Sequence, residues 1–398
     1  EVRFLRAYFY FELIKRYRNI PFVLDVLAQN EANGVNPESY EKIAKFIVDE
    51  CSDLAQILPV NYDNFSTKEK GRVTRAAAMA LKSRVTLYMA SPLFSEDSED
   101  KWKQAAEAAY DIIKQKTDLG LDLVPYPQIF NDVNNQKAEV ILYRPTGESG
   151  DFEKANFPIG VEGGKTSTCP TQNLMEAYDM KDGTPFVWNN QSDPYDNRDP
   201  RMKYTIVCNE MKWPVDPVEI WEGGTNGLPL QNATTTGYYL KKYVNNTISF
   251  EAGSTVTKKQ HNWVLFRYGE ILLNYAEAMI NAFHDPNYKD AVYNMSAREA
   301  VNQIRGRTNI SLPGFPSDIT EKDFVKRLKN ERRVELAFEG HRFWDVRRWK
   351  ELGQTANIYG VKITKNNEVI SYEKFLLETR AVTDNMYFYP IPNTERFK

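Results

Sequence analysis

The chain has 398 residues, with 51 lysines and arginines against 54 aspartates and glutamates, so its formal net charge is −3 at pH 7. This balance, with cations scattered along the chain, excludes the basic field of a nucleic-acid-binding protein. Three cysteines without CxxC spacing indicate neither a disulfide framework nor a zinc site, and a pair between Cys169 and Cys208 stays open. No apolar run of the sequence approaches the roughly 18 residues that span a bilayer.

The first residues have the pattern of the middle of a folded helix and not of a leader, so we expect an N-terminally truncated sequence. Leu5, Phe9 and Leu13 recur at helical spacing and predict a helix over 2–17. A second helix is predicted for 37–58, where apolar residues again mark one face. The two segments predict an antiparallel helix pair.

The second pair of predicted helices has the clearest pattern. Residues 72–89 carry alanines on one face, which lets a partner helix approach closely. Residues 101–116 follow with Trp102, Ala106 and Ala109 at helical spacing. An alanine-rich helix followed by one with a leading aromatic residue resembles a tetratricopeptide unit.

Residues 119–260 differ in character, because glycine, proline, asparagine, aspartate and threonine are dense there and helical periodicity recurs only near 172–178. Short strands are predicted for 140–143, 204–208 and 238–243. An irregular stretch of this length inside a compact protein usually carries function. Aromatic residues crowd it: Phe186, Trp188, Tyr195, Tyr204, Trp213, Trp221, Tyr238, Tyr239 and Tyr243.

Helical periodicity returns after residue 260. A third pair is predicted at 262–282 and 296–306, and a fourth unit at 321–352. The remaining residues look loop-like, with the sequence IYGVKIT as a possible strand.

These patterns predict a mainly α fold in a single domain, 1–398. About four tetratricopeptide-like helix pairs form a scaffold from residues 1–118 and 261–352. A large irregular, loop-rich region with short strands, 119–260, is the predicted binding region, and 353–398 is a predicted extended tail.

The segment 330–352 concentrates charged and aromatic residues. Glu331, Glu335 and Glu339 recur every four residues, so three carboxylates share a helical face near several arginines and His341. Acid–base or metal chemistry is one interpretation, but HExxH spacing is absent from the sequence. A core helix fixed by ion pairs is the interpretation we favour.

Other catalytic motifs receive little support. Gly163 to Thr166 lacks the first glycine of a phosphate-binding loop, and no GxSxG is present in the sequence. The acidic turn 192–201 lacks the final acidic ligand of a calcium loop, so we interpret it as a capped turn. A glycosidase pair of carboxylates among the 54 acidic residues stays open. No cofactor and no metal are predicted.

Flat aromatic faces beside amides or carboxylates are what carbohydrate or peptide binding requires. The loop-rich region offers several such combinations, although each aromatic residue could also anchor its own loop. The candidate ligand contacts are Trp188, Tyr195, Trp213, Trp221, Asn189 and Asn190.

Several blocks together resemble the SusD/RagB family of nutrient-binding lipoproteins of Bacteroidetes. The blocks are FLRAYFYFELIKRYRNIPFV, GRVTRAAAMALKSRVTLYMASPLF, CPTQNLMEAYDMKDG, NWVLFRYGEILLNYAEAM, ERRVELAFEGHRFWDVRRW and MYFYPIPNTE. Their order along nearly the whole chain makes the resemblance specific.

The resemblance implies a protein that is not an enzyme, is lipid-anchored at the outer membrane and faces the cell exterior. It implies capture of an oligosaccharide or polysaccharide, or in some members a peptide, for a SusC-like TonB-dependent transporter. A glycoside hydrolase and a helical scaffold that binds only protein are the alternatives. In this light a structural ion-pair network is expected from Arg84, Glu277, Glu331, Glu335, Glu339 and Arg342.

Overall fold

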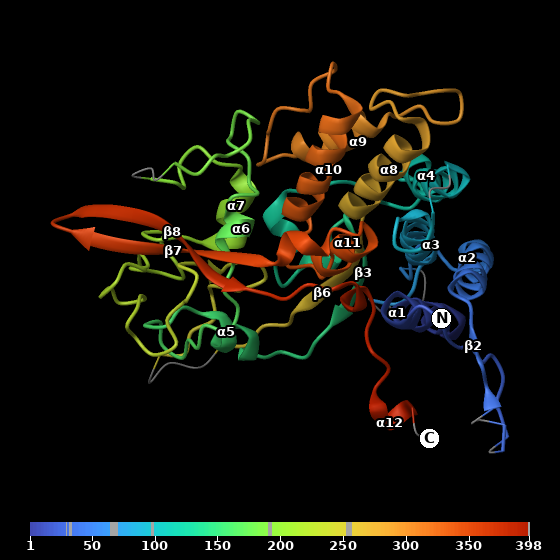
Figure 1. Cartoon of the computed structure of the whole chain (residues 1–398), viewed down its shortest axis with the longest axis horizontal. Helices are drawn as coiled ribbons and strands as arrows, with labels where there is room; N and C mark the ends of the chain where they lie inside the picture. The colour runs from blue at the N-terminus through green and yellow to red at the C-terminus, as the bar shows by residue number, and fades with distance from the viewer. Residues whose placement is uncertain are drawn as a thin grey trace.

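The computed structural model describes residues 1–28, 30–31, 34–63, 71–96, 99–189, 193–251 and 257–396. Helices gather on one side of the molecule, and loops with short strands lie on the other (Figure 1). We call the first part the scaffold and the second the loop-rich half. The scaffold helices are α1 (Val2–Tyr17), α2 (Tyr40–Ile57), α3 (Arg75–Ala90), α4 (Glu99–Lys114), α8 (Tyr268–Phe283), α9 (Ala297–Arg305), α10 (Glu321–Glu335) and α11 (Arg342–Arg348).

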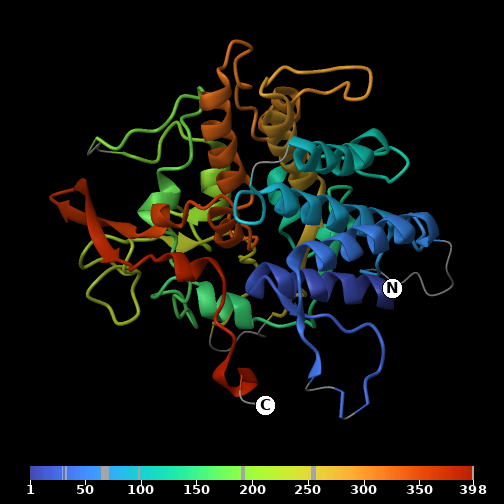
Figure 2. The same ribbon diagram turned by 45° about the vertical axis from the view of Figure 1, so that its right-hand side comes forward.

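The scaffold helices pack mainly on their neighbours in the chain. Helices α1, α2, α3 and α4 contact one another in order, α4 contacts α8, and α8 packs on α9 and α10. Figure 2 shows α1 to α4 side by side from a second direction. Ala77 and Ala80 of α3 are fully buried, as the close approach of neighbouring helices requires. The prediction of a mainly α fold is confirmed.

The loop-rich half contains short elements joined by long irregular segments. They are η2 (Tyr126–Ile129), η3 (Asn134–Gln136), β3 (Val140–Pro145), α5 (Asp151–Asn156), α6 (Gln172–Met175), α7 (Pro200–Thr205), β4 (Ile206–Val207) and β5 (Tyr239–Leu240). Strands β4 and β5 pair with each other. Asp199 caps α7 by accepting a hydrogen bond from the backbone N–H of Arg201, which agrees with the capped turn predicted there.

The segment before α8 differs from the sequence prediction. Residues 262–267 were expected to begin a helix, but they form strand β6 (Asn262–Arg267), which pairs antiparallel with β3. The segment NWVLFR is rich in aromatic and β-branched residues, which suit a strand. Because β3 lies far away in the sequence, periodicity alone did not separate strand from helix here.

The tail contains a long hairpin of β7 (Asn357–Asn366) and β8 (Val369–Thr379). Strand β7 includes the predicted strand IYGVKIT, whereas β8 lies in sequence expected to be loop-like. Asn367 and Glu368 join the strands, and both have positive φ, as a two-residue hairpin turn requires. The tail also contains η4 (Leu352–Thr355), η5 (Asp384–Tyr387) and α12 (Asn393–Arg396). Near the N-terminus, between α1 and α2, β1 (Ile20–Pro21) pairs with β2 (Pro37–Glu38).

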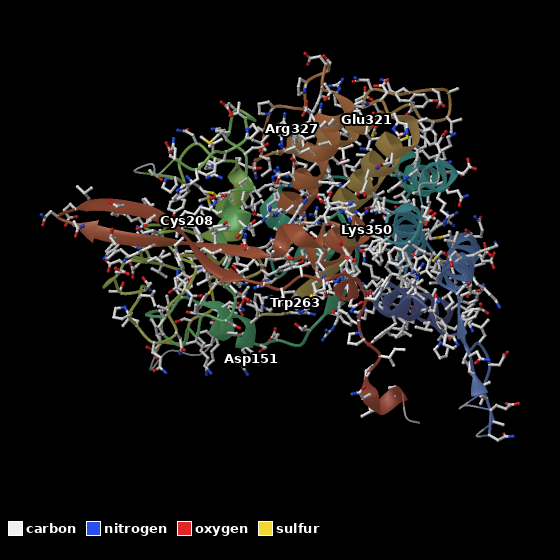
Figure 3. The ribbon with its side chains drawn as sticks, viewed as in Figure 1. Asp151, Cys208, Trp263, Glu321, Arg327 and Lys350 are labelled. Carbon is white, nitrogen blue, oxygen red and sulfur yellow. The ribbon has the colours of Figure 1, made fainter. Side chains whose placement is uncertain are left out.

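Each half has its own apolar core. The core of the scaffold contains residues from α1 to α4, α8, α9 and α10. A second core lies in the loop-rich half, where Val361 and Ile363 of β7 pack with Tyr238 and Trp213. The hairpin is therefore part of the loop-rich half. Cys208 lies buried in this half (Figure 3), and both Cys208 and Cys169 are free thiols.

Candidate functional site

Glu335 is the centre of an ion-pair cluster between the scaffold and the loop-rich half. It accepts hydrogen bonds from Arg201 at 2.8 Å, Arg267 at 2.8 Å and Arg307 at 2.9 Å. Glu335 itself is fully buried at the end of α10. We call this group the seam cluster; its members are Glu139, Asp199, Arg201, Lys242, Arg267, Arg305, Arg307, Glu331, Glu335 and Glu339.

The two other glutamates of the predicted row also belong to the seam cluster. Glu331 accepts from Arg201 at 2.5 Å and from Arg305 at 2.7 Å. Glu339 lies in the turn after α10 and accepts from Arg267 at 2.7 Å and Lys242 at 2.9 Å. Three carboxylates from one short segment therefore fix strands and loops that are far away in sequence.

The electrostatics of the seam cluster favour ion pairing over acid catalysis. Burial by itself would raise the pKa of these carboxyl groups, but the neighbouring cations hold the pKa of Glu331, Glu335 and Glu339 below its ordinary value. A general acid needs a carboxyl pKa that is raised toward neutrality. These carboxylates stay ionised and remain matched to their guanidinium and ammonium partners.

A second ion-pair cluster connects scaffold helices with one another. Asp345 of α11 accepts from Arg332 at 2.9 Å and from Arg348 at 2.9 Å. Arg348 also donates to Glu277 of α8 at 2.6 Å. Arg84 of α3 pairs with Glu270 at 2.6 Å nearby. Arg84 and Glu277 are thus both held in buried ion pairs, through partners that the sequence did not indicate.

Arg342 lies outside both clusters, which corrects its assignment to the structural network. Its guanidinium group donates to the side-chain oxygen of Gln354 at 2.9 Å and is half-buried. Asp345 and Arg348, three and six residues further along α11, turn toward α8 and α10 instead. The position of Arg342 at the start of α11 therefore keeps its side chain away from the residues of the two clusters.

His341, the residue that first suggested acid–base or metal chemistry, is buried beside Arg332. Burial, together with the charges of Arg84 and Arg332, holds the pKa of His341 well below its usual value, so the imidazole is neutral. Its Nε2 lies 4.0 Å from Glu270. In the part of the chain that the structure describes, no group of three or more His, Cys, Asp or Glu side chains could hold a metal ion.

The loop-rich half contains a cavity that combines aromatic and amide side chains, which we call the aromatic cavity. Its volume is about 440 Å³. Three distant segments build it: η2 and the residues after it, α7 and the following loop, and the loop between β5 and β6. The lining includes Phe130, Asn131, Asp132, Tyr204, Trp213, Lys241, Tyr243, Asn245, Asn246, Thr247 and His261.

Stacked and edge-on rings support one wall of the aromatic cavity. The ring centroids of Phe130 and Tyr243 lie 5.0 Å apart, and Tyr243 lies 4.9 Å from Trp263. Trp263 stacks in turn on His261 at 5.2 Å, near the junction with the helices (Figure 3). Such contacts hold the rings in fixed orientations, which lowers the entropy cost of ligand binding.

Polar groups on the rim of the aromatic cavity are held by local hydrogen bonds. The backbone N–H of Asn245 donates to Glu153 at 2.9 Å, and the hydroxyl of Thr247 donates to the side-chain oxygen of Asn245 at 2.7 Å. Asp132 pairs with Lys259 at 3.4 Å across the rim. The cavity therefore presents amide, hydroxyl and carboxylate groups beside aromatic rings.

The seam cluster also supports the floor of the aromatic cavity. Lys242 donates to Glu339 and to the hydroxyl of Tyr126, each at 2.9 Å, and its ammonium group lies 3.9 Å from the centre of the Phe130 ring. Burial lowers the pKa of Lys242 to about 8, while Glu339 opposes that effect. The segment 330–352 thus positions the cavity without lining it.

The predicted ligand contacts do not share one site. Trp213 lines the aromatic cavity but is buried, with Lys241 over its ring at 4.9 Å. Tyr195 is buried between Tyr238 and Tyr372, with ring distances of 6.1 Å and 5.3 Å.

The remaining predicted contacts lie in other places. Trp221 is half-buried under Lys365, whose ammonium group lies 4.6 Å from its ring centre. Trp188 is half-buried beside Phe186 at 6.4 Å, and the next residue, Asn189, is exposed. Asn190 lies outside the described residues.

Sequence reasoning missed most of the aromatic cavity. Asn245 and Asn246 follow Tyr243 after one intervening residue, Val244, which is close to the aromatic-amide pattern that suggested Trp188. That signal was present in the sequence. The proximity of Phe130 to Tyr243 was not, because it depends on the tertiary fold.

Fold and cavity together define a class of protein: a stacked-helix scaffold that carries a loop-rich half with an aromatic, amide-lined cavity. Residues 129–398, more than half of the chain, match the family model described as the SusD family, and the chain belongs to that family. No curated protein sequence matches the chain significantly. None of the helices in the described residues combines the length and the apolar character that crossing a membrane requires.

Several solved structures with similar folds come from Bacteroides species. A SusD-like protein from Bacteroides fragilis is 27% identical, with a TM-score of 0.81 over 99% of this chain and 76% of its own. A SusD-like carbohydrate-binding protein from the same species is 26% identical, with a TM-score of 0.81 over 100% of this chain and 77% of its own. Surface glycan-binding protein A from Bacteroides uniformis, at 18% identity and a TM-score of 0.67 over 99% of this chain and 74% of its own, shows the shared fold.

Proposed function

We propose that this protein is a non-enzymatic cell-surface protein that binds an oligosaccharide or polysaccharide in the aromatic cavity. The observation that carries the proposal is one cavity of about 440 Å³ that combines the half-buried ring of Tyr204, backed by the buried rings of Phe130 and Tyr243, with the amides of Asn245 and Asn246. Sugar rings stack on aromatic faces through their apolar C–H groups, and their hydroxyls require fixed donors and acceptors. Membership of the SusD family supports the same role.

The cellular location and the partner of the protein are inferred from its family. We infer that the protein is lipid-anchored at the outer membrane, faces the cell exterior and delivers its ligand to a SusC-like TonB-dependent transporter. The support is the family match and the similarity to a carbohydrate-binding protein of Bacteroides fragilis. Co-purification of the full-length protein with a transporter tests this partner.

A double variant of the aromatic cavity tests the ligand site. Tyr204→Ala with Asn246→Ala removes a half-buried ring and an exposed amide from the lining. Losing one stacking contact and one hydrogen bond should weaken binding about tenfold or more. Calorimetry or affinity electrophoresis against a panel of neutral and acidic polysaccharides measures the effect.

The hairpin offers a matched control for that variant. Tyr359→Ala with Asn366→Ala also removes a half-buried tyrosine and an exposed asparagine, outside the aromatic cavity. The control should keep the affinity of the parent. Equal affinities for the parent and the cavity variant would reject the aromatic cavity as the site. Trp188→Ala and Trp221→Ala in the same titration test the two half-buried tryptophans proposed as further contacts.

Two alternatives give different results in these measurements. A glycoside hydrolase would release new reducing ends from a bound polysaccharide, whereas a binding protein leaves the number of ends unchanged. A peptide-binding member of the family would bind peptides and none of the polysaccharides. Either outcome would replace the proposed function.

A further inference from the structure

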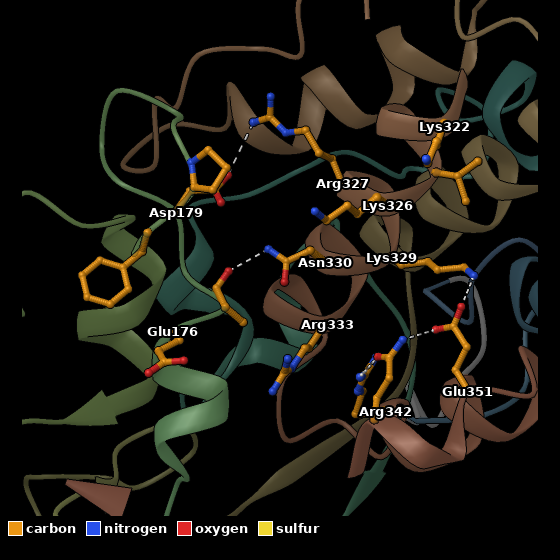
Figure 4. Close-up of a pocket in the computed structure, with 15 residues that line it drawn as sticks. Glu176, Asp179, Lys322, Lys326, Arg327, Lys329, Asn330, Arg333, Arg342 and Glu351 are labelled. Carbon is orange, nitrogen blue, oxygen red and sulfur yellow. Dashed lines mark hydrogen bonds and ion pairs between the residues drawn. The ribbon is translucent and has the colours of Figure 1, made fainter. Parts of the chain in front are cut away.

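A second cleft lies between α10 and the loop 176–186, with α11 and η4 at one end (Figure 4). Its volume is about 500 Å³, and we call it the basic cleft. The side chains that line it include six cations and three carboxylates, although the chain as a whole carries a net charge of −3. The cations are Lys322, Lys326, Arg327, Lys329, Arg333 and Arg342.

The three carboxylates of the basic cleft are already paired. Asp179 lies 3.6 Å from Arg327 and Glu351 pairs with Lys329 (Figure 4). The third, Glu176, pairs with Lys374 of β8 at 2.8 Å.

Four cations of the cleft therefore lack a carboxylate partner among the residues that the structure describes: Lys322, Lys326, Arg333 and Arg342. The two arginines have only neutral acceptors there. Arg333 donates to the backbone oxygen of Asn173 at 2.7 Å, and Arg342 donates to the side-chain oxygen of Gln354 at 2.9 Å.

This arrangement differs from that of most buried arginines in the protein. Arg201, Arg267 and Arg348 each pair with two or more carboxylates. Burial and the nearby charge of Arg342 lower the pKa of Arg333 to about 10. An unmatched pair of guanidinium groups in a cleft is electrostatically costly unless an anion binds between or beside them.

The other cations extend the site along α10. Lys322, Lys326 and Arg333 are separated by four and seven residues, so they lie on one face of the helix. Eleven residues of helix correspond to about 16 Å. A row of that length matches an extended ligand with repeated negative charges better than a single small ion.

We propose that the basic cleft binds a saccharide that carries carboxylate or sulfate groups, with Arg333 and Arg342 contacting one anionic group and Lys322 and Lys326 contacting others. That the ligand is a saccharide rests on the proposed function. That it is negatively charged follows from the unmatched cations of the basic cleft. Phe186 adds an aromatic ring to the lining, next to Trp188. The described lining residues belong to helices and loops, so the cleft has no strand edge to which an extended acidic peptide could add.

Charge-matched polymers test the proposal. Polygalacturonate and dextran sulfate should bind the parent at least about tenfold more tightly than methyl-esterified polygalacturonate and dextran, and this preference should weaken with added salt. Binding of only the carboxylate polymer or only the sulfate polymer would support the proposal and identify the anionic group.

Two variants locate the binding. Lys326→Gln with Arg342→Gln removes two unmatched cations and should weaken binding of the anionic polymer about tenfold or more. The control, Lys45→Gln with Arg380→Gln, makes the same change in net charge at exposed positions outside the lining and should leave binding unchanged. Circular dichroism and thermal denaturation verify that both variants are folded.

Three results would overturn the proposal: equal binding of charged and esterified polymers, equal losses in the cleft and control variants, or binding of polyglutamate as tight as that of the polysaccharides. Binding of a neutral glycan by the parent and the cleft variant would show that the proposed function holds even if the basic cleft binds no anion. If the parent bound none of the glycans, that result would reject the proposed function instead.

Discussion

The scaffold helices meet through a large apolar core and one ion-pair cluster, whereas the larger seam cluster of ion pairs lies where the scaffold meets the loop-rich half. Helices α3 and α8 meet their neighbours through residues such as Ala77, Ala80 and Leu272, which are fully buried. The loop-rich half is joined to the scaffold by the seam cluster, in which Glu335 alone contacts three arginines. Apolar packing has little directional preference, whereas ion pairs and their hydrogen bonds require a defined geometry.

That difference explains how an irregular half keeps a fixed position. Loops and strands as short as two residues provide few backbone hydrogen bonds of their own. Arg201 comes from the six-residue helix α7 and Lys242 from the loop after β5, and both are held by carboxylates at the end of α10 or just after it. We infer that the seam cluster contributes mainly to the specificity of the arrangement and less to net stability, because desolvation offsets much of the attraction.

The largest effect is expected for Glu335→Gln. The substitution keeps the shape of the side chain but leaves Arg201, Arg267 and Arg307 with one fewer buried carboxylate. Breaking a buried ion pair from one side should lower the free energy of unfolding by about 3–5 kcal/mol. Urea denaturation measures the change.

Glu321→Gln on the same helix is the control for that variant, because Glu321 is exposed. Its effect on the free energy of unfolding should stay within about 0.5 kcal/mol. A cost below about 1 kcal/mol for Glu335→Gln would contradict the role given to the seam cluster.

An effect of intermediate size is expected from His341, on the pH dependence of the free energy of unfolding. Because the folded protein holds the pKa of His341 well below its usual value, only the unfolded state takes up this proton as the pH falls below about 6.5. The contribution of His341 to the free energy of unfolding should therefore decrease by up to about 1.4 kcal/mol for each pH unit below that value.

The variant His341→Gln isolates this effect, since glutamine keeps an acceptor near Arg332 but does not titrate. The difference in unfolding free energy between parent and variant, measured by denaturation at pH 7, 6 and 5, should shift steadily in favour of the variant. A constant difference would show that His341 does not resist protonation in the folded protein.

The smallest effect on stability is expected for Arg342→Gln. Arg342 belongs to neither cluster, and its recorded acceptor is the neutral side chain of Gln354. The free energy of unfolding should change by no more than about 0.5 kcal/mol, as for other substitutions outside a buried network. A loss comparable to that of Glu335→Gln would restore Arg342 to the structural network.

Local sequence patterns predicted much of the scaffold. Buried Ala76 and Ala80 lie on one row of α3, and the four-residue spacing of Glu331 and Glu335 places both carboxylates on one face of α10. The family blocks were also visible in the sequence. These features depend on neighbours within a few turns of helix, so periodicity and motif spacing report them.

The binding half was less predictable, because its contacts join distant residues. Strand β6 was mistaken for helix since its partner β3 lies more than one hundred residues earlier, and β8 lacked a recognisable pattern until it paired with β7. Aromatic composition indicated that the loop-rich region binds a ligand, but only the fold brought Phe130, Tyr204 and Tyr243 to one cavity.

By itself the sequence determined the helical scaffold, the row of glutamates and the family, because each is encoded in local spacing. Only the tertiary structure decided which cations those glutamates meet, and that Arg342 remains unmatched beside Arg333. Charge pairing depends on distances between segments that are far apart in the chain. The same physical reason separates the clustered arginines, which pair with carboxylates, from the two unmatched arginines that line the basic cleft.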